Sequence, residues 1–378
     1  MTAMRVSAVN VFVVPAGWRE FVLIQVVTED GARGVGEATM AGQTRPVVAA
    51  LLQLSEDLVG RDARAITAHV DRWLGAYWRG GPILPTAIGG LEIALWDLFG
   101  QALGVPIYQL LGGACLEAVP VYANSWFERG PDQRDAVEPA DLASAAARVR
   151  DAGYLALKLY PLGYASSSRP ISNSDLVRGV ERVAAVREAI GPGIDLMLDL
   201  QGMLTATQAI WFANRCITFH PCWLEEPLPP DDLDGVARVA WQSRIPIALG
   251  ERLYSLEAFA QVLARHGCAI AQPDPLHVGG LIAFRRVAAL AGAAHVAVAP
   301  HNSNGPVALA ACVHLAAALP EVVTVEYPLD RVVPWRDDLV DMPYTPVEGV
   351  IQLPRRPGLG LRLTDDVVQR YAVNTVRA

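Results

Sequence analysis

Two kinds of apolar spacing succeed each other in the first part of the chain. Residues 6–13 and 21–27 are β-type runs, and the glycine-rich passage 31–37 follows them, which predicts a small antiparallel sheet. Apolar residues then recur every three or four positions, the period of a helix with one buried face. Helices are predicted in this way at residues 45–59, 65–78 and 86–103. Residues 1–117 are therefore predicted to form an α+β domain.

From residue 119 onward, short β-type runs alternate with alanine-rich stretches of helical period. The candidate strands are residues 119–123, 155–160, 195–200, 222–225, 246–250, 269–273, 294–299 and 322–327. Helical stretches lie between them, among them residues 142–152, 175–190, 206–214, 256–266 and 281–291. Such alternation is typical of a (β/α)8 barrel, which we assign to residues 118–345.

The end of the chain is β-like again, at residues 347–354 and 358–363. We expect residues 346–378 to return to the first domain. The predicted fold class is thus α/β, with a (β/α)8-type barrel and an N-terminal α+β capping domain that the C-terminal segment completes.

Composition narrows the classes of function. The chain has 378 residues, 52% hydrophobic and 19% charged, enough for a large core in two domains. Its net charge of -8 and the lack of a basic run argue against a nucleic-acid partner. Five cysteines without C-x-x-C spacing indicate buried thiols in a reducing compartment. With no signal-peptide layout and no long uninterrupted apolar stretch, we expect a cytoplasmic protein that does not enter a membrane. A homo-oligomer is expected as well.

Six residues that can bind a metal or carry a proton stand at the ends of successive candidate strands. They are Asp199, Glu225, Glu251, Asp274, His301 and Glu326. They follow one another at intervals of 23 to 27 residues, about the length of one strand, one helix and two loops. A parallel barrel places such residues at one end, where carboxylates can converge on one cation while His301 faces a substrate. The pattern indicates an active site.

Short motifs along nearly the whole chain carry a resemblance to one family. They are Gly36-Glu-Ala, Ala94-Leu-Trp-Asp97, Leu110-Leu-Gly-Gly113, Lys158, Leu224-Glu-Glu-Pro227, Gly250-Glu-Arg252, Gln272-Pro-Asp274, Gly279-Gly280, Pro300-His301-Asn302 and Pro357-Gly-Leu-Gly360. In this order they resemble the mandelate racemase group of the enolase superfamily. Residues 119–124 and the Lys-x-x-Pro-x-Gly motif at 158–163 look similar, more narrowly, to gluconate and arabinonate dehydratases.

The resemblance implies removal of the proton α to a carboxylate, assisted by one Mg²⁺ per subunit. The expected ligands are Asp199, Glu225 and Glu251, a set of oxygen donors that suits Mg²⁺ better than Zn²⁺. Lys158 and His301 are the candidate bases on opposite faces of the substrate, and the choice between them stays open. Asp274 is expected to orient His301, and Glu326 to lie near the substrate carboxylate, either as a protonated donor or as an orienting group.

Two positions depart from the pattern of the related dehydratases. Tyr160 stands where many relatives have a second lysine, and Gln201 stands where a histidine is expected. Tyr160 is either a replacement proton carrier or an ordinary strand aromatic. The candidate substrate-contacting residues are Arg19, Tyr160, Gln201, Arg252 and His277. An exposed Arg19 could pair with a distal carboxylate, and the capping loops at 16–19, 39–43 and 78–81 are expected to set specificity.

The expected function is that of a lyase acting on a small-molecule carboxylate. It would remove the α proton of a sugar acid and eliminate the β-hydroxyl, giving a 2-keto-3-deoxy acid. One alternative is a racemase, epimerase or cycloisomerase that uses the same enolate half-reaction on a hydroxy acid or sugar lactone. Another is a barrel that binds a sugar acid without turnover, which the missing lysine and Gln201 would explain.

Overall fold

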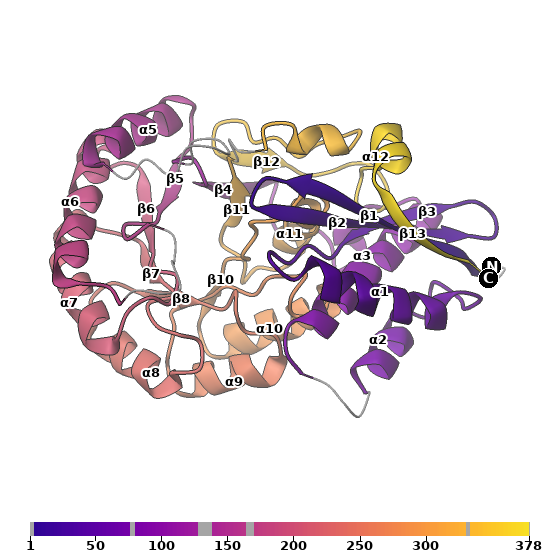
Figure 1. The fold of residues 1–378 in the computed structure, drawn as a ribbon, viewed down its shortest axis with the longest axis horizontal. Coiled ribbons are helices and arrows are strands. Elements are labelled where there is room, and N and C mark those ends of the chain that lie inside the picture. The colour runs from indigo at the N-terminus through magenta and orange to yellow at the C-terminus, as the bar shows by residue number, and fades with distance from the viewer. Residues whose placement is uncertain (1–3, 76–79, 128–137, 164–169, 330–332, 378) are drawn as a thin grey trace.

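Eight short parallel strands form a closed ring in the computed structural model, which describes residues 4–75, 80–127, 138–163, 170–329 and 333–377. They are β4 (Ala118–Asn124), β5 (Ala156–Leu159), β6 (Asp195–Asp199), β7 (Trp223–Glu225), β8 (Ile247–Leu249), β9 (Ile270–Ala271), β10 (Ala297–Val298) and β11 (Val325–Pro328). Neighbours in the chain pair in order, and β11 returns to β4. A parallel bridge between Val298 and Val322 closes the ring. The predicted barrel is therefore confirmed (Figure 1).

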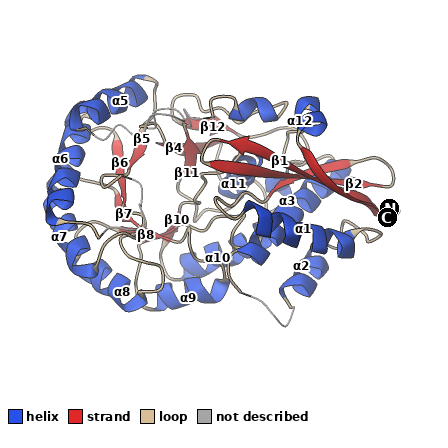
Figure 2. Cartoon of the chain, viewed as in Figure 1, coloured by secondary structure: helices blue, strands red, loops and turns tan. Residues whose placement is uncertain are grey.

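Helices follow the strands around the outside of this ring, as Figure 2 shows. They are α5 (Pro139–Asp151), α6 (Asn173–Ile190), α7 (Ala206–Cys216), α8 (Leu233–Gln242), α9 (Leu256–Ala264), α10 (Leu281–Ala293) and α11 (Pro306–Ala318). Side chains of Ser172, Thr205 and Ser255 cap the first turns of α6, α7 and α9. Short 3₁₀ turns lie at η1 (Ile217–Phe219) and η2 (Arg336–Leu339). The first helical element described after β11 is the 3₁₀ turn η2, at the point where the barrel pattern would have its eighth helix.

The capping domain is an antiparallel sheet covered by helices. Its strands are ordered β13 (Ala372–Arg377), β1 (Val6–Ala16), β2 (Arg19–Thr28) and β3 (Arg33–Glu37). Its helices are α1 (Thr44–Leu58), α2 (Ile66–Leu74), α3 (Ile83–Leu103), α4 (Ile107–Leu110) and α12 (Asp365–Arg370). The helix predicted at 65–78 ends at Leu74, and residues 76–79 lie outside the described residues.

Helix α3 is the central helix of the capping domain. A Cβ at Gly34 or Gly36 of β3 would overlap backbone oxygens of α3, so only glycine allows the sheet and helix to pack this closely. By length and composition α3 could cross a membrane, yet 78% of its most apolar window is buried inside the protein. Its apolar character therefore fits a core helix.

The C-terminal segment divides between the two parts of the protein. Strand β13 pairs with β1 in the capping sheet, as expected. Strand β12 (Val350–Gln352) instead pairs antiparallel with residues 118–120 of β4, so the prediction for residues 347–354 is wrong. The reason is that β4 begins before its barrel neighbours do. Its first residues have no barrel partner, and β12 binds their backbone groups.

Two buried glutamates join the capping domain to barrel helices. Glu37 accepts hydrogen bonds from the backbone N–H groups of Gly305 (2.6 Å) and Ala308 (2.9 Å) at the start of α11. Glu92 accepts from the first two N–H groups of α10, at 2.8 and 3.0 Å. The first turn of a helix has N–H groups without partners in the helix, and negative charge is stabilised there. These contacts fix the capping domain against the barrel.

Candidate active site

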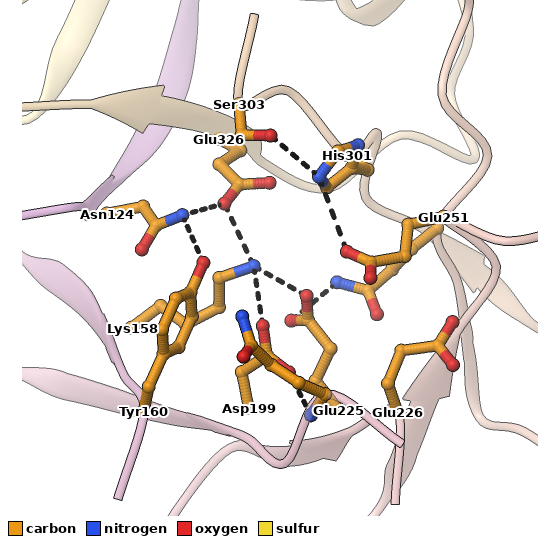
Figure 3. Close-up of polar contacts among 12 residues, drawn as sticks. Asn124, Lys158, Tyr160, Asp199, Glu225, Glu226, Glu251, His301, Ser303 and Glu326 are labelled. Carbon is orange, nitrogen blue, oxygen red and sulfur yellow. Dashed lines mark hydrogen bonds and ion pairs between the residues drawn. The ribbon is translucent and has the colours of Figure 1, made fainter. Parts of the chain in front are cut away.

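Three carboxylates predicted as metal ligands meet at the carboxyl end of the barrel. Asp199 and Glu225 are the last residues of β6 and β7 and are paired in register. Glu251 lies two residues beyond the end of β8. One oxygen from each of the three lies within 4.8 Å of the others. The close-up in Figure 3 shows them facing a common space.

The electrostatics of this group fit a hard cation. Burial, together with the negative charge of Glu225, raises the pKa of Asp199 well above its ordinary value. Burial and the nearby glutamates also raise the pKa of Glu251. Carboxylates this close repel one another, and a divalent cation relieves that repulsion. The three donors are all oxygens, the ligands that Mg²⁺ and Ca²⁺ prefer.

Lys158, from β5, is fully buried among these carboxylates. Its Nζ lies 2.5 Å from Glu225 Oε1, 2.8 Å from Glu326 Oε1 and 3.7 Å from Asp199 Oδ2. Burial alone would lower the pKa of Lys158, but the charges of Glu225 and Glu326 outweigh it and raise the pKa well above the ordinary value. In this arrangement Lys158 is an ammonium ion shared between carboxylates.

His301 and Asp274 form the predicted pair. His301 Nδ1 lies 2.8 Å from Asp274 Oδ2, and His301 Nε2 lies 3.3 Å from Glu251 Oε2. Burial would lower the pKa of His301, yet the carboxylates of Glu251 and Asp274 raise it to about 10. Asp274 also accepts from Asn304 Nδ2 at 2.9 Å and from Leu276 N at 2.8 Å. With Asp274 accepting at Nδ1, the Nε2 atom of His301 is the one that faces the carboxylate cluster.

The carboxylate of Glu326, on β11, is held by three groups. It accepts hydrogen bonds from Asn302 N at 2.9 Å and from Asn124 Nδ2, and it pairs with Lys158. Burial would raise the pKa of Glu326, but Lys158 and His301 lower it below the ordinary value. Of the two predicted roles, this environment favours an ionised orienting group over a protonated donor.

The predicted substrate-contacting residues fall into two groups. Arg252 pairs with Glu226 at 2.5 Å and lies 3.8 Å from Glu251, and His277 stacks on His301 with ring centroids 6.5 Å apart. Tyr160 accepts from Asn124 Nδ2 at 3.0 Å, and the backbone N–H of Gln201 donates to Asp199 at 2.8 Å. These four adjoin the cluster.

Arg19 does not behave as predicted. It is only 5% exposed, and its guanidinium lies 4.5 Å from the centre of the Trp18 ring and 5.0 Å from that of Phe21. Flanking aromatic rings attract a guanidinium, so the side chain packs instead of extending into solvent. The expectation of an exposed arginine is therefore wrong.

Sequence reasoning missed several residues that contact the cluster. They are Asn124, Trp223, Gln272, Ser303 and Asn304. Trp223 precedes Glu225 by two residues, and Gln272 precedes Asp274 by two. Residues two apart on a strand share a face, so this period was the available signal for Trp223 in β7, whereas Gln272 and Asp274 lie beyond the end of β9. Ser303 and Asn304 lie in the irregular segment after His301, where no period helps.

The fold and the site together define a class of protein. A closed parallel barrel with charged residues at the carboxyl ends of its strands is the architecture of barrel enzymes. The family model described as the mandelate racemase / muconate lactonizing enzyme N-terminal domain matches residues 5–112. The enolase C-terminal domain-like model matches residues 141–367. The chain therefore belongs to the mandelate racemase / muconate lactonizing enzyme family of the enolase superfamily.

Within this family, the chain is similar to particular dehydratases and solved structures. The chain is 35% identical to the D-gluconate dehydratase of Thermoproteus tenax over 94% of this chain and 71% of that protein. It is 34% identical to the D-galactonate dehydratase of Ralstonia nicotianae over 97% of this chain and 94% of that protein. A solved enolase-superfamily structure from Salmonella Typhimurium has a TM-score of 0.92 at 27% identity and covers 99% of this chain and 100% of that one. A mandelate racemase/muconate lactonizing enzyme from Jannaschia sp. CCS1 has a TM-score of 0.89 at 31% identity, covering 99% of both chains.

Proposed function

We propose that this protein is a Mg²⁺-dependent dehydratase of an aldonic acid, a sugar acid with hydroxyl groups on the carbons α and β to its carboxylate. The curated relatives are sugar-acid dehydratases, and the protein is an enzyme of the lyase class. The observation that carries the proposal is the approach of His301 Nε2 to within 3.3 Å of Glu251, one of three clustered carboxylates.

Asp199, Glu225 and Glu251 would hold the cation through carboxylate oxygens. A divalent cation there would neutralise the charge that develops on the substrate carboxylate as the α proton leaves. Arg252, ion-paired with Glu226 beside Glu251, would keep the third ligand in place. Lys158 lies beside Glu225 and Asp199 and is joined to Glu326 by an ion pair.

His301 is the proton carrier in this proposal. The Lys158 side chain is 0% exposed and tied to carboxylates, whereas the His301 side chain is 11% exposed. A cation held by Glu251 would offset part of the negative charge that raises the pKa of His301, and so would favour the neutral imidazole. Because Asp274 accepts from Nδ1, the lone pair of this neutral imidazole would be at Nε2, where it can take the α proton. The C–H electrons move first into the substrate carboxylate and then return to form the carbon–carbon double bond as the bond from the β carbon to its hydroxyl breaks. The proton on Nε2 joins the departing hydroxide as water, and the resulting enol rearranges to the 2-keto-3-deoxy acid.

We also propose a cytoplasmic location. All five cysteines are free thiols in the described structure, in keeping with a reducing, cytoplasmic compartment. We propose a homo-oligomer whose only small-molecule partner at this site is the carboxylate substrate.

Product analysis tests the proposal. Purified enzyme with Mg²⁺ is incubated with a panel of mono- and diacid sugars, and 2-keto acid is detected with semicarbazide. Activity is expected to vanish with EDTA and to return with Mg²⁺. Full turnover in metal-free protein contradicts the metal assignment. Exchange of the α hydrogen in D2O without a keto acid would instead identify a racemase or epimerase, and absence of both would leave a binding protein.

A further inference from the structure

Glu225 has an unusual set of partners for a residue at the centre of a carboxylate cluster. Its Oε1 pairs with Lys158 Nζ at 2.5 Å. Its Oε2 accepts two further hydrogen bonds, from Trp223 Nε1 at 3.0 Å and from Gln272 Nε2 at 2.8 Å. Both donors are neutral, and both bind the same oxygen. The two oxygens of one carboxylate therefore have separate environments.

The two donors are held rigidly inside the barrel. Trp223 is 4% exposed and makes an edge-to-face contact with Tyr122, with ring centroids 5.5 Å apart. Its side chain lies on the same face of β7 as Glu225, two residues earlier. Gln272 is 1% exposed, and its backbone N–H donates to Leu249 O at 2.8 Å. Neither donor can turn away without disturbing the barrel interior.

Gln272 makes this contact at a cost. Its Oε1 atom is buried and has no hydrogen-bond partner among the described residues. A buried polar atom without a partner costs about 1–3 kcal/mol, and most native structures avoid it. A carboxylate can only accept, so the amide must present its NH2 group to Glu225 and leave its oxygen unsatisfied. A stability cost retained at this position points to a role in the site.

We propose that Trp223 and Gln272 are positioning residues that fix the rotation of the Glu225 carboxylate for cation binding. By holding Oε2, the two neutral donors fix the plane of the carboxylate, and Oε1 faces the Lys158 ammonium, which also lies 3.7 Å from Asp199. A freely rotating carboxylate would lose entropy on binding the cation, whereas a fixed one has already lost it. This inference rests on the proposed metal site and adds two residues to it.

The test measures metal binding directly. Trp223→Phe keeps the ring and its contact with Tyr122 but removes the N–H donor. Gln272→Met keeps the length of the side chain and removes the amide. The affinity for Mg²⁺ is measured by titration calorimetry and that for Mn²⁺ by electron paramagnetic resonance, both on the full chain without substrate. Thermal unfolding is measured in EDTA on the same samples.

A matched control is available in the capping domain. Trp96 Nε1 donates to the buried Glu92 carboxylate at 2.8 Å, the same chemistry as the Trp223 contact but outside the cluster. Trp96→Phe should lower the unfolding temperature in EDTA and leave the metal affinity unchanged. It measures the general cost of losing an indole-to-carboxylate hydrogen bond.

We expect Trp223→Phe and Gln272→Met each to weaken metal binding about 10-fold, the lower end of the range for groups that orient ligands. We also expect unfolding temperatures in EDTA no lower than that of the Trp96→Phe control. Wild-type affinity in both folded variants overturns the inference. If either variant is too unstable to measure, the other decides. If the wild-type protein binds neither cation, the proposed metal site itself fails, an outcome distinct from the failure of the positioning role.

Discussion

Glu37 offers the sharpest test of how the capping domain supports the site. It lies at the end of β3 and is fully buried. It accepts from Gly305 N, Ala308 N and Thr39 Oγ1 at 2.6, 2.9 and 2.6 Å. Gly305 is only four residues beyond His301, so one carboxylate fixes both the start of α11 and the end of the segment that carries His301. Replacing Glu37 should therefore affect stability and catalysis together.

The magnitude follows from the contacts. Glu37→Ala leaves two buried N–H groups of α11 without acceptors, at about 1–3 kcal/mol each. Loss of negative charge at the helix N-terminus adds about 0.3–1 kcal/mol. Burial raises the pKa of Glu37, so removing the charge recovers part of this loss. We expect a net loss of roughly 2–5 kcal/mol of unfolding free energy for Glu37→Ala. Glu37→Gln keeps one accepting oxygen and should lose about half as much.

The assay combines urea unfolding, followed by circular dichroism, with steady-state kinetics and metal titration. Glu29→Gln, an exposed glutamate just after β2, serves as the control. For Glu37→Gln we expect a lower kcat with unchanged Mg²⁺ affinity, because the segment after His301 loosens while the three ligands keep their strands. A Glu37→Ala protein within 0.5 kcal/mol of wild type, on the scale of ordinary surface substitutions, would refute the reasoning.

Three further predictions concern the proton carriers and pH. Asp274→Asn should lower kcat by ~10²-fold or more with a modest change in KM, because the interaction between Asp274 and His301 matters most when the imidazole takes up charge. Steady-state kinetics on the sugar acid identified by screening checks this prediction. A change in KM alone would make Asp274 a binding residue. His301→Asn should abolish both elimination and deuterium exchange at the α carbon, and proton NMR measures the exchange. If exchange survives in His301→Asn and disappears in Lys158→Met, Lys158 is the base. Burial raises the pKa of Glu92 to about 7. The folded state then binds more protons than the unfolded state between about pH 4.5 and 7, so Glu92 makes stability fall as pH rises through that range. Urea unfolding at pH 5 and pH 8 should show a smaller decrease for Glu92→Gln than for wild type, and equal decreases would rule out this source of pH dependence.

The strand-end pattern predicted the barrel site well because it depends on a local rule. Asp199 and Glu225 end strands of one parallel sheet, so the register of neighbouring strands brings them together without further information. Asp274 and His301 lie beyond two-residue strands, yet they still meet at 2.8 Å, since the barrel fixes where each loop begins. The regular spacing of these strand-end residues along the sequence therefore predicts most of the geometry of the cluster.

What the sequence did not predict depends on contacts across the fold. The pairing of β12 with β4 arises because β4 extends beyond its barrel neighbours, which no periodicity reveals. The packing of Arg19 against Trp18 and Phe21 depends on the side-chain arrangement of the hairpin. The sequence pattern also gives no indication that Glu37 accepts hydrogen bonds from α11. Such long-range hydrogen bonds become visible only when the two domains are placed together.

Tyr160 affects the cluster because, unlike a lysine at the same position, it adds no positive charge beside Lys158. Five carboxylates of the described cluster, Asp199, Glu225, Glu251, Asp274 and Glu326, have four basic side chains within 4 Å: Lys158, Arg252, His277 and His301. Arg252 also pairs with Glu226, and burial lowers the pKa of His277, so negative charge remains in excess. A second lysine at position 160 would add positive charge beside Lys158 and lower its pKa, favouring a neutral amine. Tyr160 adds none, and Lys158 stays a counterion for Glu225 and Glu326. The excess negative charge is what a divalent cation would offset, and in the proposed mechanism the proton is carried by His301.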